Sequence, residues 1–286
     1  MTPTRPGNGV PLPERQAVAA ALAAARQVGM PVVAVGANAR LLAFDGPLGL
    51  TPPRTTLDWD FAARCDSWPD YQRLREACLA AGFKPGNHEH EVLHTETGVK
   101  VDLVPFGKLE SAQGRITWPD SGFTMNVRGL PEAMAAATPV NLGPPAGEVA
   151  VPPTPVLVAL KILAHGDRGG RDDRDLRDLW HLITHYPSDD LLRAYEPPLE
   201  ALVAREDFDA AHLSPLLAGA DVAAACHAAT LDDLLPILTA LGDPNTPQLW
   251  PLVGGHYDEE QQDRRRREVA DSFRWMRLAI EAAALP

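Results

Sequence analysis

Hydrophobic and polar positions change period several times along the first part of the chain. Residues 14–28 are strong helix formers that end before Gly29, as a helix commonly does. Residues 31–36 form a short β-branched run that ends at a glycine, which predicts a buried strand. The next residues, 37–44, continue with a helical pattern. The sequence therefore begins with a predicted helix, followed by a strand, a glycine turn and a second helix.

A two-residue alternation marks residues 55–64 as a strand. Trp59 and Phe61 fall on one face of this strand, whereas Asp58 and Asp60 fall on the other. Trp59 is therefore expected in the core, pointing away from the two carboxylates.

Further elements of both kinds follow up to residue 151. Residues 69–81 have apolar positions at helical spacing. Residues 88–95 and 100–106 resemble two strands of a hairpin that turns at Gly98. We also predict short strands over 123–127 and 148–151 and a short helix over 131–137.

The pattern becomes almost entirely helical beyond residues 151–155. We predict helices over 155–166, 171–186, 188–204, 208–227, 230–241 and 257–284. The expected organisation is a disordered lead-in (1–13), an α/β (α+β) domain with a small mixed sheet (14–150) and an all-helical domain (151–286). We expect the active site between the last two, since pockets concentrate at domain interfaces.

Composition narrows the functional classes. The 286 residues are 45% hydrophobic and carry a formal net charge of −12, which disfavours a general nucleic-acid coat protein. The three cysteines have no metal-ligand spacing, and no apolar run reaches the about 18 residues of a membrane span. The start also lacks the layout of a signal peptide. We therefore expect a cytoplasmic protein without membrane contact.

The candidate chemistry lies in three carboxylates. Asp58 and Asp60 point the same way from one strand, and Asp102 lies between apolar residues on a later strand. An Asp-x-Asp pair alone is usually a solvated strand face. Three clustered carboxylates repel one another, however, and Mg²⁺ or Mn²⁺ relieves that repulsion by taking their oxygens as ligands. Two such ions can clamp the attacking and leaving oxygens of a nucleotidyl transfer.

The ordered set resembles the nucleotidyltransferase superfamily, whose pattern is an apolar residue and glycine, an apolar-Asp-apolar-Asp segment and a later strand aspartate. Gly36, the Asp58–Asp60 pair and Asp102 match this pattern in order. The resemblance implies a nucleotidyltransferase-like fold and a glycine turn that approaches a bound triphosphate.

The residue after that glycine is usually glycine or serine in the superfamily, but here it is Ala37. Asn38 and Arg40 are candidates to replace the missing hydroxyl and to contact the phosphates. The segment between the glycine turn and the Asp pair is also longer than is typical.

Three segments resemble the AbiEii-type nucleotidyltransferases, the toxin partners of type IV toxin–antitoxin pairs. They are residues 54–61, 160–168 and 174–179, the last two matching a Lys-x-x-Ala … Arg … (Lys/Arg)-Asp-x-x-Asp-Leu signature. The resemblance implies that Lys161 binds nucleotide phosphates and that Asp175 orients or deprotonates the acceptor hydroxyl. Two structural alternatives stay open: Lys161 extends from an apolar helix face to solvent, and Asp175 belongs to a solvated charge run.

The expected function is transfer of a nucleotide from an NTP to an acceptor, with Mg²⁺ or Mn²⁺. The resemblance suggests RNA (tRNA especially), protein or a small molecule as acceptor, and a cognate antitoxin as partner. Two alternatives remain: an antibiotic or small-metabolite nucleotidyltransferase, and a nucleotide-binding protein without turnover.

His88, His90 and His94 also fall on one face of the expected strand over 88–95. Same-face histidines can bind zinc, but no fourth ligand is evident nearby. We expect the polar face of an edge strand, from which one histidine could touch substrate.

Overall fold

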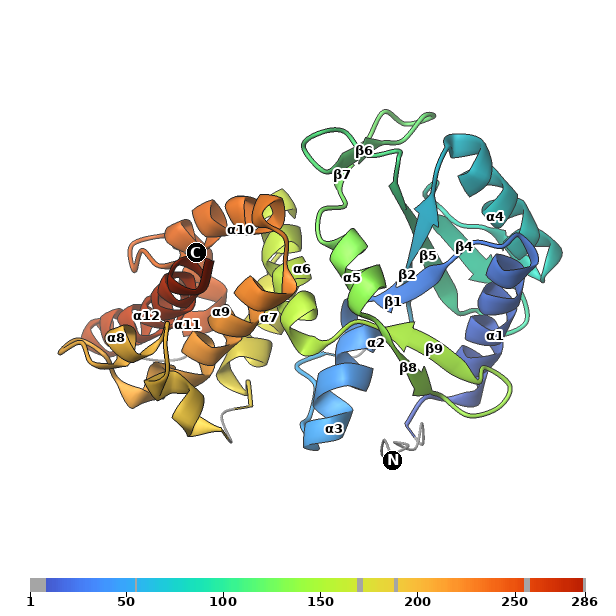
Figure 1. Ribbon diagram of the computed structural model, residues 1–286. Helices are drawn as coiled ribbons and strands as arrows, with labels where there is room; N and C mark the ends of the chain where they lie inside the picture. Colours follow the sequence, from blue (N-terminus) through green and yellow to red (C-terminus); the bar gives the residue numbers. More distant parts are fainter. Residues whose placement is uncertain (1–8, 55, 169–171, 188–189, 255–257, 285–286) are drawn as a thin grey trace. The chain divides into compact units, whose positions relative to one another are not determined.

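The computed structural model describes residues 9–54, 56–168, 172–187, 190–254 and 258–284 (Figure 1). Its contacts divide the chain into two compact units, Met1–Leu157 and Val158–Pro286. Residues 1–8 of the predicted disordered lead-in lie outside the described residues, and the first helix already begins at Leu12. No helix in the described part of the chain combines the length and apolar character that a membrane crossing requires.

A five-stranded mixed sheet forms the centre of the first unit. Its spatial order is β1 (Val32–Val35), β2 (Trp59–Cys65), β5 (Lys100–Gly107), β4 (Glu91–His94) and β3 (Phe83–Pro85). The central pair β2–β5 is parallel, and the other neighbours are antiparallel. The predicted hairpin of β4 and β5 is confirmed, and so is the predicted small mixed sheet.

Two helices, α1 (Leu12–Gln27) and α4 (Trp68–Ala80), lie together along one side of this sheet, and α5 (Leu130–Ala136) lies on the other (Figure 1). Trp59 of β2 is fully buried under α1, where its indole Nε1 donates a 2.9 Å hydrogen bond to Glu14 Oε2. Because side chains alternate along a strand, Asp60 then points to the opposite face. The expected separation of the core tryptophan from the carboxylates is confirmed.

A continuous helical run follows β1 and forms the first part of the long segment before the Asp pair. It consists of α2 (Gly36–Arg40), a π-helical turn (Leu41–Asp45) and α3 (Gly46–Leu48). The buried Arg40 Nε lies 3.3 Å from Asp45 Oδ2 inside this run. The first part of this segment, up to Leu48, therefore forms ordered helix that contains a buried ion pair.

Two small antiparallel ribbons complete the first unit. They are β6 (Arg115–Thr117) with β7 (Thr124–Asn126), and β8 (Thr138–Asn141) with β9 (Glu148–Val151). The strands β7 and β9 and the helix α5 match the predicted elements. Their partners β6 and β8, of three and four residues, were not predicted.

The second unit is helical in its described residues, as predicted. Its α-helices are α6 (Thr154–Arg168, which begins at the end of the first unit), α7 (Arg174–Thr184), α8 (Glu200–Val203), α9 (Leu213–Ala225), α10 (Ala228–Leu241), α11 (Trp250–Val253) and α12 (Glu259–Ala284). The helices α9 and α12 approach closely at Gly219, where a Cβ atom would lie 2.3 Å from the Met276 carbonyl oxygen.

The predicted helix over 188–204 is wrong. Residues 188–189 lie outside the described residues, and the rest forms a 3₁₀ turn (Leu191–Tyr195) and the short α8. The Pro197–Pro198 pair separates them, because proline lacks the N–H that a helix interior needs and the residue before proline avoids the helical conformation.

Candidate active site

The structure brings the three predicted carboxylates to one region of the first unit. Asp60 of β2 and Asp102 of β5 are register partners on neighbouring parallel strands, so both side chains project from the same face. Asp58 lies just before β2, and its Oδ2 is 3.2 Å from Lys100 Nζ. The same Nζ is 3.6 Å from Asp102 Oδ2. One ammonium group thus connects the Asp58 side of the cluster with the Asp102 side.

Gly36 closes this region from the β1 side. Its predecessor Val35 pairs with Asp60, and Gly36 itself has a φ of +73°, a conformation that favours glycine. A Cβ atom at this position would lie 2.0 Å from Asp60 Oδ2. Two constraints therefore favour glycine at this position: the positive φ angle and the close contact with the Asp60 carboxylate.

Two functional candidates, Glu91 and Lys100, escaped the sequence analysis. Glu91 of β4 is the register partner of Asp102, and its Oε1 lies 3.2 Å from Lys100 Nζ. The Glu91 Oε2 accepts hydrogen bonds from the backbone N–H groups of Asn87 and His88. A signal for Lys100 was available, because it lies two residues before Asp102 and so shares its strand face. Glu91 needed the exact hairpin register, which the pattern does not supply.

Burial and charge make Asp102 unusual among these groups. Burial, followed by the neighbouring carboxylate of Asp60, raises the Asp102 pKa to about 7, although Lys100 opposes this shift. The Asp102 Oδ1 is buried and has no hydrogen-bond partner among the described residues. Burial alone lowers the pKa of Lys100, but Asp102, Glu91 and Asp58 outweigh it and raise that pKa. The cluster therefore strongly favours an added positive charge.

Asn38 and Arg40 are both buried in α2 and are held by contacts within the chain. Asn38 Nδ2 donates a 2.9 Å hydrogen bond to the Asp58 carbonyl oxygen, which fixes the backbone just before β2. Arg40 Nη2 donates to the Arg54 carbonyl oxygen at 3.4 Å, besides its ion pair with Asp45. Their predicted contacts with phosphates stay predictions, whereas their support of the Asp58 segment is visible.

Lys161 and Asp175 meet in the second unit. Lys161 Nζ of α6 lies 2.9 Å from Asp175 Oδ1 and 2.8 Å from Asp178 Oδ2 of α7, and Arg168 also pairs with Asp175. Lys161 and both aspartates are buried. The two structural alternatives are therefore wrong: Lys161 does not extend to solvent, and Asp175 is not part of a solvated run. Their roles toward nucleotide and acceptor stay predictions.

A comparison with models of protein families identifies the family of this chain. A family model described as nucleotidyl transferase AbiEii toxin, type IV TA system, matches residues 48–275. The chain belongs to the AbiEii nucleotidyltransferase family. The match contains the three aspartates as well as Lys161 and Asp175, whereas Gly36 lies before it. The predicted family is confirmed.

Comparisons with curated proteins and solved structures add little to the AbiEii assignment. No curated protein matches the chain. The solution structure of the antibiotic-resistance factor ANT(2'')-Ia is 14% identical, with 66% of this chain and 94% of that chain covered and a TM-score of 0.36. An antigenic nucleotidyltransferase-like protein from Paracoccidioides brasiliensis is 18% identical, with 68% and 88% covered and a TM-score of 0.37. Likenesses this distant carry no argument about substrate.

A histidine joins the carboxylates of this AbiEii-family chain. Ligand atoms of His90, Glu91 and Asp102 lie within 4.8 Å of one another. Burial lowers the His90 pKa, which favours the neutral ring, and His88 stacks on it with the ring centroids 5.6 Å apart. The prediction that the three histidines share one strand is wrong, because β4 begins only at Glu91. The His94 ring instead packs against Phe83 and contacts Thr97.

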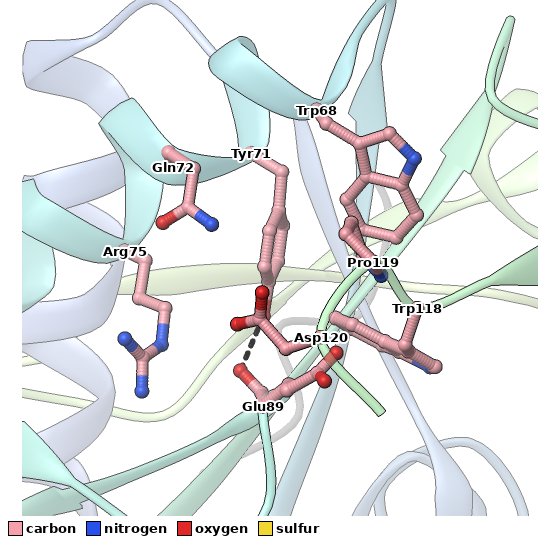
Figure 2. A pocket seen from close by; sticks show the side chains of 8 residues that line it. All are labelled: Trp68, Tyr71, Gln72, Arg75, Glu89, Trp118, Pro119 and Asp120. Atoms are coloured by element: carbon pink, nitrogen blue, oxygen red, sulfur yellow. Dashed lines mark hydrogen bonds between the residues drawn. The ribbon is translucent and has the colours of Figure 1, made fainter. Parts of the chain in front are cut away.

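A small pocket of about 60 Å³ lies next to the turn that carries His88 and His90 (Figure 2). Its lining residues are Trp68, Tyr71, Gln72, Arg75, Glu89, Trp118, Pro119 and Asp120. The Tyr71 hydroxyl donates to the Glu89 carbonyl oxygen, shown as a dashed line, and lies 3.2 Å from the Leu103 carbonyl oxygen. Trp68, Tyr71 and Trp118 pack on one another, with ring centroids 5.4–5.9 Å apart. The aromatic rings thus anchor the turn that carries His90 to α4 and β5.

Proposed function

We propose that this AbiEii-family chain transfers a nucleotide from an NTP to an acceptor with the help of divalent ions, Mg²⁺ or Mn²⁺, at Asp58, Asp60 and Asp102. The observation that carries the proposal is the register pairing of Asp60 with Asp102, closed by a glycine that abuts Asp60. Family membership supports the nucleotidyl transfer. The carboxylate geometry supports the dependence on metal.

The residues present fit divalent ions. Carboxylate oxygens are the ligands that Mg²⁺ and Mn²⁺ prefer. Asp102 Oδ1 is buried and has no hydrogen-bond partner in the part of the chain that the structure describes, and burial together with the nearby Asp60 raises the Asp102 pKa. A cation would satisfy this oxygen and relieve the repulsion that raises the pKa. The ammonium of Lys100, which already lies among the acidic groups, marks the region as one that attracts cations.

In the proposed reaction an acceptor oxygen attacks the α-phosphorus of the NTP, and the bond to the β-phosphate breaks to release pyrophosphate. Divalent ions, when bound, supply positive charge that stabilises the phosphate oxygens of the transition state. Asp58 and Asp60 would hold these ions, and Asp102 would complete the shell of one ion and help to activate the acceptor hydroxyl. Gly36 keeps the backbone clear of the Asp60 carboxylate.

Further roles follow from the family signature. Lys161 binds the NTP phosphates as a point positive charge, and Asp175 orients the acceptor hydroxyl. Gly36, Asn38 and Arg40 of α2 approach the triphosphate. The acceptor is RNA, with tRNA as the first candidate, or protein, and the reaction takes place in the cytoplasm, where NTPs are abundant. A cognate antitoxin restrains the activity.

The test is transfer of label from each of four α-labelled NTPs, with Mg²⁺ or Mn²⁺, to a panel of bulk tRNA, total protein and aminoglycosides. We expect transfer by the wild-type chain and none by Asp60→Ala. Asp66→Ala is the matched control, because Asp66 lies just beyond β2 in an exposed pair with Lys108. Full activity of Asp60→Ala would refute this site. Nucleotide binding without turnover on any acceptor would instead favour a binding protein.

A further inference from the structure

Lys100 is the first residue of β5, and its side chain is surrounded by acidic groups from three segments. Its Nζ lies 3.2 Å from Asp58 Oδ2, 3.2 Å from Glu91 Oε1 and 3.6 Å from Asp102 Oδ2. Only 29% of the Lys100 side chain is exposed. An ammonium group with three carboxylate neighbours at such distances is a cation ligated by oxygens, as a bound metal ion would be.

The place of this ammonium relative to the proposed metal ligands is informative. Asp58 and Asp102 are two of the three carboxylates that would hold the ions, and Nζ contacts both of them. A divalent ion that bridged the same two carboxylates would have to lie close to Nζ. Two positive charges at that separation repel strongly where solvent is scarce. The ammonium and an ion therefore compete for this position.

Glu91 holds Lys100 in place from the side opposite Asp58. Only 10% of the Glu91 side chain is exposed. Its Oε2 accepts hydrogen bonds from two backbone N–H groups, which restrict the movement of the carboxylate. The remaining oxygen, Oε1, is directed at Lys100 Nζ. This anchored carboxylate fixes the ammonium as a permanent part of the cluster.

We propose that Lys100 takes the place of one of the two divalent ions, so that the site binds a single ion, at Asp60 and Asp102 Oδ1. The inference rests on the proposed function, because it presumes that the carboxylates bind metal. It predicts a one-ion site in which a lysine provides the second positive charge. Removal of that lysine should open a second ion position without any new ligand.

The experiment counts bound Mn²⁺ by electron paramagnetic resonance during titration of the full chain, alone and with a non-hydrolysable NTP analogue. We expect one Mn²⁺ per wild-type chain in both cases. Lys100→Met should bind two, with the spectral broadening of a closely spaced pair, and Lys100→Arg should again bind one. Lys108→Met is the matched control, since it removes the same charge from the exposed pair with Asp66 and should bind one.

Circular dichroism and thermal melting of each variant establish that it is folded before its ions are counted. Two ions per wild-type chain would overturn the inference and leave the proposed function intact. A single ion in a folded Lys100→Met chain would also overturn it. No Mn²⁺ in the wild-type chain under either condition would overturn the inference together with the metal dependence of the proposed function.

Discussion

Replacement of Gly36 by alanine should have two effects. It strains the backbone at the glycine turn, and it displaces the Asp60 carboxylate beside the turn. Gly36 has a φ of +73°, and alanine in a left-handed conformation costs roughly 1–2 kcal/mol. The new Cβ would lie 2.0 Å from Asp60 Oδ2, where ordinary contact begins at 3.4 Å. The carboxylate oxygen therefore has to move by about 1.4 Å, and changes that disturb the orientation of a metal ligand typically reduce metal affinity about 10- to 100-fold.

Gly29→Ala is a close control, because Gly29 has a φ of +67° and no atom within 4 Å of a new Cβ. Both variants should lose roughly 1–2 kcal/mol of unfolding free energy, since the Asp60 side chain can rotate away from the clash. Thermal melting checks this part. Mn²⁺ affinity, measured by titration, should fall about 10- to 100-fold in Gly36→Ala alone. Wild-type Mn²⁺ affinity in Gly36→Ala would refute the argument that this glycine exists to accommodate the carboxylate.

Three further predictions concern stability. Burial raises the pKa of Glu14, and its hydrogen bond with Trp59 only partly opposes this, so the ionised form is disfavoured in the fold. Glu14→Gln should therefore stabilise the chain at pH 7–8, and this gain should shrink as pH falls toward the ordinary Glu pKa, as followed by melting across pH. Lys161→Met leaves two buried aspartates without their lysine and should cost about 3–5 kcal/mol in urea unfolding. Gly219→Ala should cost about 1–3 kcal/mol by thermal melting, because its Cβ would meet the Met276 backbone.

Each of the three stability predictions has an outcome that would contradict it. An equal melting difference between Glu14→Gln and wild type at every pH would exclude ionisation as the cause. Wild-type stability of Lys161→Met would mean that the aspartates are not buried against the lysine. Gly166→Ala is the comparison for Gly219→Ala, because its Cβ would meet only the flexible Ile237 side chain. Equal losses in these two variants would contradict the backbone clash.

The sequence was sufficient to find the three carboxylates, because local patterns of apolar and polar residues indicated them. Alternation placed Asp58 and Asp60 away from Trp59, and the apolar neighbours of Asp102 marked a buried strand. The β4–β5 hairpin was also local, since one turn joins its strands. In each case the relevant information lay within about ten residues.

Glu91 was missed because its role depends on register between strands, whereas Lys100 was missed although its spacing from Asp102 places both on one strand face. Glu91 faces Asp102 only through the hairpin pairing, and Lys100 meets Asp58 only because β2 and β5 run parallel as neighbours. Such pairing is a property of the assembled sheet, and no periodicity along the chain encodes it. The buried environment of Lys161 was equally hidden, since two helices must pack before its aspartate partners surround it.

The parallel pairing of β2 with β5 has a consequence for the cell that makes this protein. Asp58 and Asp60 leave the ribosome well before Asp102, with α4 and two strands between them. A nascent or truncated chain that ends before β5 contains only two of the three carboxylates of the proposed metal site. If the proposed transfer harms the host, a chain released before β5 is made would lack the complete carboxylate set and should be unable to carry out the reaction.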